Sequence, residues 1–473
     1  MGANFMLETC LPDGQGSDYK ILVDCGLHQG EKFCEGENCL DFGYNPSEVD
    51  VLIVTHSHAD HIGRIPKLVH EGFKGVIYST QETKEIAEIM LQDALKFVLR
   101  EASAPTPTKK KGVGVSTESV GREKREPIYT KEDIAHTMSL WKEIPYHKEF
   151  DLGGGFNVYF KDAGHILGSV IAEITFLPDG KAGNGKKIAF TGDLGNSPTP
   201  FLRDVEEVTD ADYILMESVY GDRNHEDVEL RKEKLKSVVK DTIGRKGTLL
   251  IPAFSVSRTQ VLLHELNDFV EKKEIPQVPV FLDSPLAIKV TEVYRSHQKN
   301  FKKSTKAQIA GGDKIFDFPK LEFTQSVEDS KSINSVPGPK IIIAGSGMST
   351  GGRIMHHERR YLGDSKTTIL FVGYQAPGSM GRIIQDGTKD IEIDKAKVSV
   401  KANIETITGY SGHMDSDHLI EFVERAGESG KLKKVFVAMG EPKSSMFLVQ
   451  RIKDYLDIDA VSPEEGESFE LDF

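Results

Sequence analysis

Short apolar runs alternate along this chain with longer stretches in which apolar residues recur every three to four positions. The runs have the length and β-branched content of buried strands, and in the second half of the chain they are Thr248–Ile251, Val278–Leu282, Lys340–Ala344 and Thr368–Val372. The longer stretches have the period of one helix face, and they carry Ile86, Ile89, Met90 and Phe97, then Leu262, Leu266 and Phe269. This alternation predicts an α/β protein.

The chain has 473 residues, which is enough for two or three domains around large buried cores. Residues from about 103 to 127 are rich in Pro, Thr, Gly and Lys and have almost no large apolar side chains. This composition predicts a mobile loop, since the segment has little apolar surface to bury. We find no internal repeat.

Charge and cysteine content narrow the class of protein. The net charge of −14 argues against a broadly basic nucleic-acid-binding surface, but it leaves room for a local one. The four cysteines, at positions 10, 25, 34 and 39, predict free thiols rather than a disulfide framework. No run approaches the roughly twenty apolar residues that span a bilayer. We therefore expect a cytoplasmic protein without a membrane partner.

Four potential metal ligands lie within six residues directly after the apolar run Val51–Val54. They are His56, His58, Asp60 and His61. Because strand residues project alternately, His56 and His58 can point to one side, while Asp60 and His61 can reach a second point. Imidazole with carboxylate is a ligand set that zinc prefers, and its division into two groups indicates two adjacent ions. The alternative, a His-rich surface loop, is far less common for this pattern.

Three further polar residues follow apolar strands or glycine turns. His165 lies in the segment 162–169, Asp193 follows the run 188–190, and Asp24 follows Ile21–Val23. Taken singly, a His beside Gly is more often an ordinary loop residue, and an Asp after a strand is usually a turn former. Together with the His-rich motif, they are better explained as parts of one metal site.

Four more motifs come later in the chain. Glu217 begins the segment 217–223, Arg258 opens an amphipathic stretch, residues 345–348 read Gly-Ser-Gly-Met, and residues 409–413 end in His413. In order and spacing, the whole set resembles the metallo-β-lactamase superfamily, and within it the β-CASP branch. That branch contains nucleic-acid hydrolases, including bacterial and archaeal relatives of the cleavage and polyadenylation endonuclease. The resemblance covers nearly the whole chain.

The resemblance implies a fold and a division into domains. The fold would be a four-layer αββα metallo-β-lactamase sandwich with an inserted α/β β-CASP domain. Residues 1–205 would form the first part of the sandwich, residues 206–388 the inserted domain, and residues 389–473 the return segment. Family members usually begin with a strand ahead of the segment that resembles residues 2–8. Because that strand is missing here, the chain is expected to be a fragment or to start late, which would expose a sheet edge.

The resemblance also implies roles for individual residues. The expected zinc ligands are His56, His58 and His165 for one ion and Asp60 and His61 for a second, with Asp193 bridging the two. Asp24 would orient ligands. The expected catalytic residues are Asp60, Glu217 and His413, with His413 protonating the leaving oxygen and Glu217 orienting its ring. The expected substrate-binding residues are Arg258, Gly345, Ser346, Gly347 and Ser411.

One position departs from the family pattern. In RNA-cleaving members a strand near the C-terminus ends in His-Gly-Glu, and that His completes the second zinc site. Here the corresponding residues are Met439, Gly440 and Glu441. A thioether is a poor zinc ligand, so the second ion is expected to be weakly held or absent. His418 is the nearest substitute in sequence, but its expected position on a helix argues against it.

These features predict a zinc-dependent phosphodiesterase that cleaves single-stranded RNA, as an endonuclease, a 5′-3′ exonuclease or both, by metal-activated hydroxide. Met439 leaves two alternatives open, because DNA-directed members carry an apolar residue at this position. They are a DNA-directed β-CASP nuclease and a degenerate member that binds nucleic acid without cutting it. A small-molecule hydrolase such as a thioesterase is disfavoured by the motifs of the inserted domain. A homodimer is the oligomeric state we consider besides a monomer.

Overall fold

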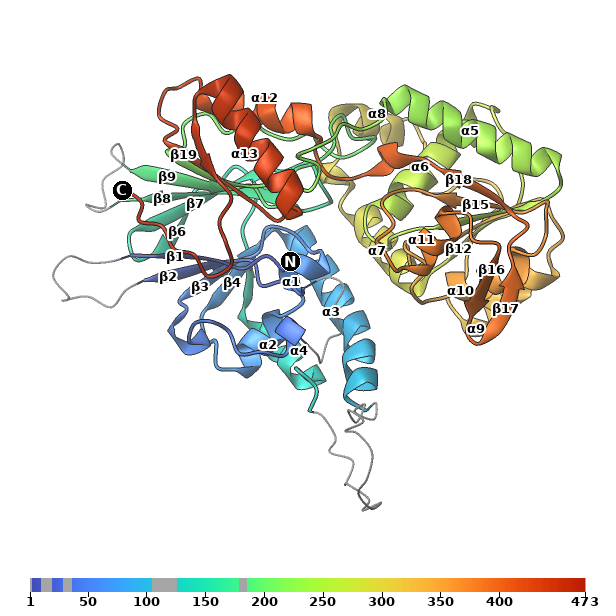
Figure 1. The fold of residues 1–473 in the computed structure, drawn as a ribbon, viewed down its shortest axis with the longest axis horizontal. Coiled ribbons are helices and arrows are strands. Elements are labelled where there is room, and N and C mark those ends of the chain that lie inside the picture. The colour runs from blue at the N-terminus through green and yellow to red at the C-terminus, as the bar shows by residue number, and fades with distance from the viewer. Residues whose placement is uncertain (1, 10–18, 29–35, 104–125, 178–184, 473) are drawn as a thin grey trace, which may run out of the picture.

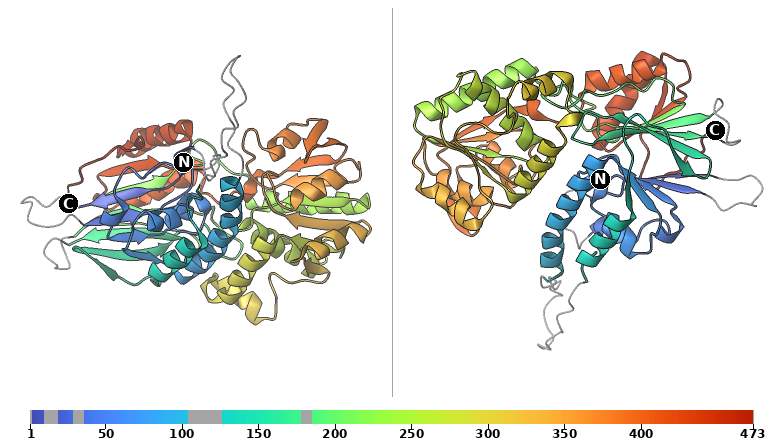
Figure 2. Two further views of the ribbon diagram at one scale, coloured as in Figure 1. Left: turned by 90° about the horizontal axis from the view of Figure 1, so that it is seen from below. Right: turned by 180° about the vertical axis from the view of Figure 1, so that it is seen from behind.

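The computed structural model describes residues 2–9, 19–28, 36–103, 126–177 and 185–472. These residues form two lobes side by side (Figures 1 and 2). The first lobe contains the N-terminal part of the chain and the C-terminal segment, and the second contains the middle. The mobile loop predicted for residues 103–127 falls almost wholly outside the described residues.

One sheet of the first lobe has five strands in the order β1-β2-β3-β4-β5. They are β1 (Phe5–Glu8), β2 (Lys20–Val23), β3 (Val51–Ile53), β4 (Val76–Ser79) and β5 (Trp141–Glu143). β1 is antiparallel to β2, and the other neighbours are parallel. Within the described residues, β1 is an edge strand.

The other sheet of this lobe has seven strands in the order β20-β19-β10-β9-β8-β7-β6. They are β6 (Phe150–Gly153), β7 (Phe156–Asp162), β8 (Val170–Phe176), β9 (Lys186–Phe190), β10 (Tyr213–Glu217), β19 (Lys434–Ala438) and β20 (Asp459–Val461). β6 to β9 form an antiparallel meander, whereas β9, β10, β19 and β20 are parallel neighbours.

The two sheets pack face to face over one apolar core, and helices cover both outer faces. Ile21 and Ile53 from the first sheet meet Phe160 and Ile174 from the second, all completely buried. The outer helices are α1 (Ala59–Ile62), α2 (Ile65–His70), α3 (Gln81–Ala102) and α4 (Lys131–Leu140) over the first sheet, and α12 (Ser416–Gly427) and α13 (Pro442–Leu456) over the second. The predicted four-layer αββα sandwich is confirmed.

The second lobe contains a six-stranded parallel sheet in the order β13-β12-β14-β11-β15-β18. Its strands are β11 (Thr248–Pro252), β12 (Val280–Asp283), β13 (Leu321–Phe323), β14 (Lys340–Ala344), β15 (Thr368–Phe371) and β18 (Asn403–Thr406). The four apolar runs predicted in this region therefore form strands. Parallel strands are buried on both faces, so Leu249 and Ile251 join one core and Leu250 the other.

Helices cover both faces of this sheet. They are α5 (Val228–Gly244), α6 (Arg258–Glu271), α7 (Pro285–Ser296), α8 (Lys303–Ala310), α9 (Val327–Ser332), α10 (Ile354–Tyr361) and α11 (Met380–Gln385). A hairpin of β16 (Asp390–Ile393) and β17 (Ala396–Ser399) precedes β18. No helix within the described ranges is long and apolar enough to cross a membrane.

Strand pairing differs from the predicted domain limits at two points. β10 lies beyond residue 205 but pairs with β9 and β19 in the first lobe. β18 lies beyond residue 388 but pairs with β15 in the second lobe. Both strands lie next to a crossing between the lobes, and pairing between strands far apart in the chain has no local signature, so the sequence alone does not identify the sheet that each strand joins.

The two lobes share an apolar interface. Ile166 and Phe201 from the first lobe belong to the same buried cluster as Tyr294 from α7. The Leu167 amide donates to the Tyr294 hydroxyl over 3.2 Å. His297, just after α7, lies between two carboxylates of α3, with contacts of 3.0 and 2.9 Å. The junction that carries the functional residues is thus held by packing as well as by charge.

Candidate metal centre

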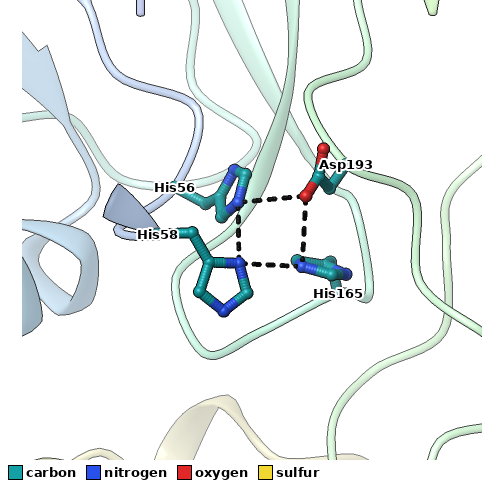
Figure 3. A group of neighbouring side chains, drawn as sticks. All are labelled: His56, His58, His165 and Asp193. Atoms are coloured by element: carbon teal, nitrogen blue, oxygen red, sulfur yellow. Dashed lines mark hydrogen bonds and ion pairs between the residues drawn. The ribbon is translucent and has the colours of Figure 1, made fainter. Parts of the chain in front are cut away.

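Three loops of the first lobe bring the predicted ligands together at the junction of the lobes. His56 and His58 follow β3, His165 follows β7, and Asp193 follows β9. Each loop leaves a buried strand, so the strand positions fix where the loops start. His56, His165 and Asp193 are almost completely buried, and Figure 3 shows the four side chains pointing toward one another.

The four facing atoms form a compact quadrilateral. His58 Nδ1 lies 3.1 Å from both His56 Nε2 and His165 Nε2. Asp193 Oδ2 lies 3.4 Å from the same two Nε2 atoms. All four atoms are within 4.8 Å of one another, which is a spacing that one ion at the centre can bridge.

Hydrogen bonds on the outer side of the rings fix which nitrogens carry protons. His165 Nδ1 lies 2.8 Å from the carbonyl oxygen of Gly412, so it donates there and its Nε2 keeps a lone pair. The Thr55 hydroxyl donates to Asp24 over 2.7 Å, and it accepts from His56 Nδ1 at 3.2 Å. The Nε2 of His56 therefore also carries a lone pair.

These tautomers make the centre a cation site. The lone pairs of His56 Nε2 and His165 Nε2 and the Oδ2 oxygen of Asp193 face the same space as His58 Nδ1. Of these four atoms only His58 Nδ1 can carry a proton, so at most one proton lies among them. Burial lowers the pKa of His58 and of His165 well below the usual imidazole value, which keeps both rings neutral. Neutral imidazoles with one carboxylate suit a divalent cation such as zinc. The residues present thus fit the metal that the sequence implies.

A second candidate ligand group shares Asp193 with the first and adds Glu217 and His413. His61 adjoins both groups, because Asp193 Oδ1 lies 3.3 Å from His61 Nε2, so the two carboxylate oxygens of Asp193 face different imidazoles. Asp24 accepts from His61 Nδ1 at 2.7 Å, which matches the orienting role predicted for it. Burial disfavours a charged His61 ring, but Asp193 and Asp24 outweigh this and raise its pKa well above the usual value.

Asp60 belongs to neither of the candidate ligand groups found among the described residues. It is a half-buried residue in the first turn of α1. His418 is not in these groups either, and its Nδ1 lies 2.6 Å from Asp415. The predicted role of Asp60 as a ligand and catalytic residue stays a prediction.

Glu217 and His413 form a pair beside Asp193. Glu217 ends β10 and is completely buried, and its Oε1 accepts from the Leu194 amide over 2.7 Å. Both of its oxygens lie 3.2 Å from His413 Nδ1. Burial disfavours a charged His413, but the Glu217 and Asp193 carboxylates prevail and raise its pKa to about 9. The arrangement holds a protonated imidazole next to the ligands.

His225 holds the backbone of His413, and the sequence analysis missed it. Its Nε2 donates to the carbonyl oxygen of His413 over 2.8 Å, and its amide donates to Asp415 over 3.1 Å. The ring of Tyr220 lies 4.2 Å from that of His225 and 6.3 Å from that of His413. In the sequence, the only indication of this role was that His225 follows Glu217 by eight residues. No local sequence pattern connects His225 with His413.

A cavity next to the ligands contains an unpaired guanidinium group. His165, Asn196, Arg258 and Ser411 are among its lining residues. The Nε of Arg258 has no hydrogen-bond partner among the described residues. Burial lowers the pKa of Arg258 to about 10, which still leaves it charged at neutral pH. A Cβ on Gly412 would lie 2.8 Å from this guanidinium group, so a side chain at this position would push the guanidinium group aside.

The other predicted substrate-binding residues lie elsewhere. Gly345, Ser346 and Gly347 follow β14 at the edge of the second lobe's sheet, and they are not among the residues that line the cavity. Met439 directly follows β19, whose last residue, Ala438, pairs with Glu217. The departure from the family pattern therefore lies close to the Glu217–His413 pair.

Comparison with known proteins agrees with this geometry. Residues 15–141 match the metallo-beta-lactamase superfamily, residues 259–384 match the Beta-Casp domain, and residues 397–463 match the Zn-dependent metallo-hydrolase RNA specificity domain. The first two matches fall in the first and second lobes, and the third covers the return segment.

Two similar proteins illustrate the relationship. Ribonuclease TTHA0252 of Thermus thermophilus is 33% identical over 407 residues, which are 86% of this chain and 85% of that protein. Transcription termination factor FttA of Methanosarcina mazei is 30% identical over 454 residues, 93% of this chain but 66% of that longer protein. A solved structure of a protein of unknown function from Enterococcus faecalis V583 aligns over 98% of this chain and 96% of its own, with 12% identity and a TM-score of 0.49.

The chain therefore belongs to the metallo-β-lactamase superfamily and, within it, to the β-CASP branch of metal-dependent hydrolases.

Proposed function

We propose that this protein is a zinc-dependent ribonuclease that cleaves phosphodiester bonds in single-stranded RNA. The observation that carries the proposal is the convergence of unprotonated ligand atoms from His56, His58, His165 and Asp193 beside the Glu217–His413 pair. Such a site can hold a metal next to a proton donor, which is what hydrolysis of a phosphodiester needs. The match to an RNA specificity domain and the similarity to a ribonuclease favour RNA as the substrate.

The proposed metal content is two zinc ions per chain. His56, His58 and His165 would hold one, Asp60 and His61 would contribute to the second, and Asp193 would bridge them. When bound, zinc would supply an activated water as nucleophile and would neutralise charge on the phosphate oxygens. The two-sided position of Asp193, with one oxygen toward His165 and the other toward His61, supports the bridging role.

His413 is the proposed proton donor to the leaving oxygen. Its protonated state follows from the neighbouring carboxylates, and Glu217 holds its Nδ1 so that the opposite nitrogen, Nε2, remains available for a substrate. The backbone contact from His225 fixes the ring's point of attachment. With His413 as the proton donor, the proposed metal-ligating histidines are His56, His58, His61 and His165.

The proposed phosphate contacts come from both lobes. Arg258 brings an unpaired positive charge to the cavity beside His165, where Ser411 offers a hydroxyl. A buried donor without a partner, such as the Arg258 Nε among the described residues, is costly unless an acceptor such as an anion completes it. Gly345, Ser346 and Gly347 are proposed to hold a further phosphate with backbone amides, because this loop follows the carboxyl end of a parallel strand.

Because of Met439, two alternatives to the ribonuclease remain part of the proposal. Without a histidine at this strand end, the second ion has one ligand fewer, which favours low turnover or a member that only binds nucleic acid. A DNA-directed nuclease is the other alternative. Cytoplasmic location stays a prediction. A homodimer stays a prediction.

The test is cleavage of 5′-labelled single-stranded RNA and of the matching DNA by zinc-loaded protein. Metal content is measured on the same samples, with the His58→Ala variant as control. We expect RNA cleavage that the variant loses. Cleavage of DNA alone would move the assignment to the DNA-directed alternative, and no cleavage with about one zinc per chain would favour the degenerate binding protein.

A further inference from the structure

Two aromatic side chains are exposed at one edge of the second lobe's sheet. Phe254 follows β11 by two residues and is 39% exposed, and Tyr374 follows β15 by three residues and is 43% exposed. β11 is hydrogen-bonded to β14 on one side and to β15 on the other, all parallel. Because carboxyl ends of parallel strands share an edge, Phe254, Tyr374 and the loop after β14 lie at the same edge.

This edge contains a point at which the chain connections diverge. β11 leads through α6 to β12, which lies beyond β14, whereas β14 leads through α10 to β15, which lies beyond β11. The two connections therefore leave in opposite directions across the sheet. In open α/β sheets, a crevice at such a point, outside the carboxyl ends of the strands, is the usual place for a ligand.

The loop after β14 contacts both aromatic segments at this edge of the sheet. A Cβ on Gly347 would lie 2.6 to 2.9 Å from atoms of the Phe254 ring, so the loop backbone lies directly against the ring. Gln375, the neighbour of Tyr374, donates from its side chain to the Gly347 carbonyl oxygen over 3.0 Å. The loop thus fixes Phe254 on one side and the Tyr374 segment on the other, and both rings still keep a large exposed fraction.

The segment that carries Phe254 also leads to the metal centre. Phe254 precedes Arg258 by four residues, and the Phe254 carbonyl oxygen accepts hydrogen bonds from the amide and the hydroxyl of Thr259 in the first turn of α6. Arg258 reaches Gly412, and His165 lies against the same glycine. A chain bound at His165 and Arg258 therefore passes toward Phe254 as it continues along the second lobe.

We propose that Phe254 and Tyr374 form a stacking site for unpaired nucleobases of the bound strand, next to the metal centre. This inference rests on the proposed function, since single-stranded nucleic acid is the ligand. Aromatic rings stack on any base and so give affinity without sequence preference. Bases within a duplex already stack on one another, so an exposed ring of this kind favours a single strand.

The experiment measures binding rather than turnover. Zinc-loaded His413→Ala protein, which should not cut, is titrated with fluorescently labelled single-stranded RNA. A series of oligonucleotides lacks one base at each successive position but keeps every phosphate. We expect removal of the stacked base to weaken binding about tenfold. Adding Phe254→Leu should weaken binding of the intact oligonucleotide to a similar extent. In this variant, removal of the base at that position should no longer change the affinity.

Two further variants separate stacking from general damage. Phe254→Trp keeps an aromatic face and should retain both affinity and sensitivity to base removal. Phe97→Leu is the matched control, because Phe97 is exposed to a similar extent, 38%, but lies on α3 in the first lobe; it should change nothing. Tyr374→Leu should remove sensitivity at a different position of the series.

Each outcome decides the proposal. Unchanged affinity in Phe254→Leu, or sensitivity to base removal that persists in it, overturns the stacking site. Failure of the proposed ribonuclease function is a separate result, because it would be seen as RNA that stays uncleaved by the zinc-loaded wild-type protein. The binding series would still report whether a base is recognised by Phe254.

Discussion

Two clusters of aspartate and histidine lie at strand ends in this protein, one in each lobe, and they differ in how their charges are satisfied. In the second lobe, Asp283 ends β12 and receives four hydrogen bonds. Thr324 and Arg353 donate to Oδ1, both at 2.7 Å, and Ser330 and His357 donate to Oδ2 at 2.6 and 2.7 Å. Burial opposes ionisation, but these donors lower the pKa of Asp283 to about 2.

Asp193 in the first lobe has a different environment. Its oxygens lie 3.3 to 3.7 Å from nitrogens of His56, His61, His165 and His413. The rings of His56 and His165 direct their protons elsewhere, so lone pairs face this carboxylate where donors face Asp283. A cluster with enough donors is complete by itself and stabilises the fold. His61 and His413 bring positive charge to Asp193 as well, so the feature that separates the two clusters is the pair of imidazole lone pairs, from His56 and His165, that converges beside Asp193 and can bind a cation.

The largest expected effect comes from removing the shared carboxylate of the metal centre. Asp193→Ala should reduce turnover to the background level and lower bound zinc, because Asp193 faces both groups of ligands. Metal analysis together with an RNA cleavage assay measures both quantities. The matched variant is Asp283→Ala, which should leave zinc content unchanged. Normal zinc and full activity in Asp193→Ala would contradict the site.

His413→Ala separates proton donation from metal binding within the first cluster. Loss of a general acid typically lowers the rate by about 10²- to 10⁴-fold, and the zinc content should stay at the wild-type level, since His413 adjoins the four-ligand group without belonging to it. Single-turnover cleavage and metal analysis of the same preparation give the two values. Loss of zinc in proportion to activity would instead make His413 a ligand.

The Asp283 cluster should govern stability rather than chemistry. Asp283→Asn should lower the free energy of unfolding by about 3 kcal/mol, because half-buried Arg353 and buried His357 lose their charged partner. The folded pKa of about 2 lies below the unfolded value near 4. The contribution of Asp283 is therefore complete above about pH 4 and is lost as the pH falls through about 2.

Urea unfolding at several pH values tests the direction of this pH dependence. The difference between the wild-type protein and Asp283→Asn should be constant from pH 7 to 5 and should shrink as the pH falls toward 3. A difference that grows on acidification would show that another group carries the stability of this cluster.

Met439→His should give the smallest change. An imidazole at this strand end adds one ligand beside the Glu217–His413 pair, so zinc per chain should rise toward two and turnover should increase several-fold. Metal titration followed by cleavage measures both. No change in either would mean that the end of β19 does not reach the second ion, and that the weak second site has another cause.

Local pattern was sufficient for much of the fold. Apolar runs such as Lys340–Ala344 predicted strands correctly, because a parallel strand buried on both faces leaves a continuous apolar signature. The limits of the inserted domain were less predictable. β10 and β18 each pair across a predicted limit, and pairing between strands far apart in the chain has no local signature.

The sequence by itself determined the ligand motif, since His56 and His58 are close in the chain and a strand end orients them within one turn. It also determined the kind of metal that suits them. The resemblance to a known family had indicated Asp193, but only the tertiary structure showed how it differs from Asp283, because both lie at the ends of apolar strands and distant segments bring different groups to them. The same holds for His225, whose contact with His413 depends on two chain crossings between the lobes. Periodicity acts over a few residues, whereas the convergence of loops depends on the packing of the whole molecule.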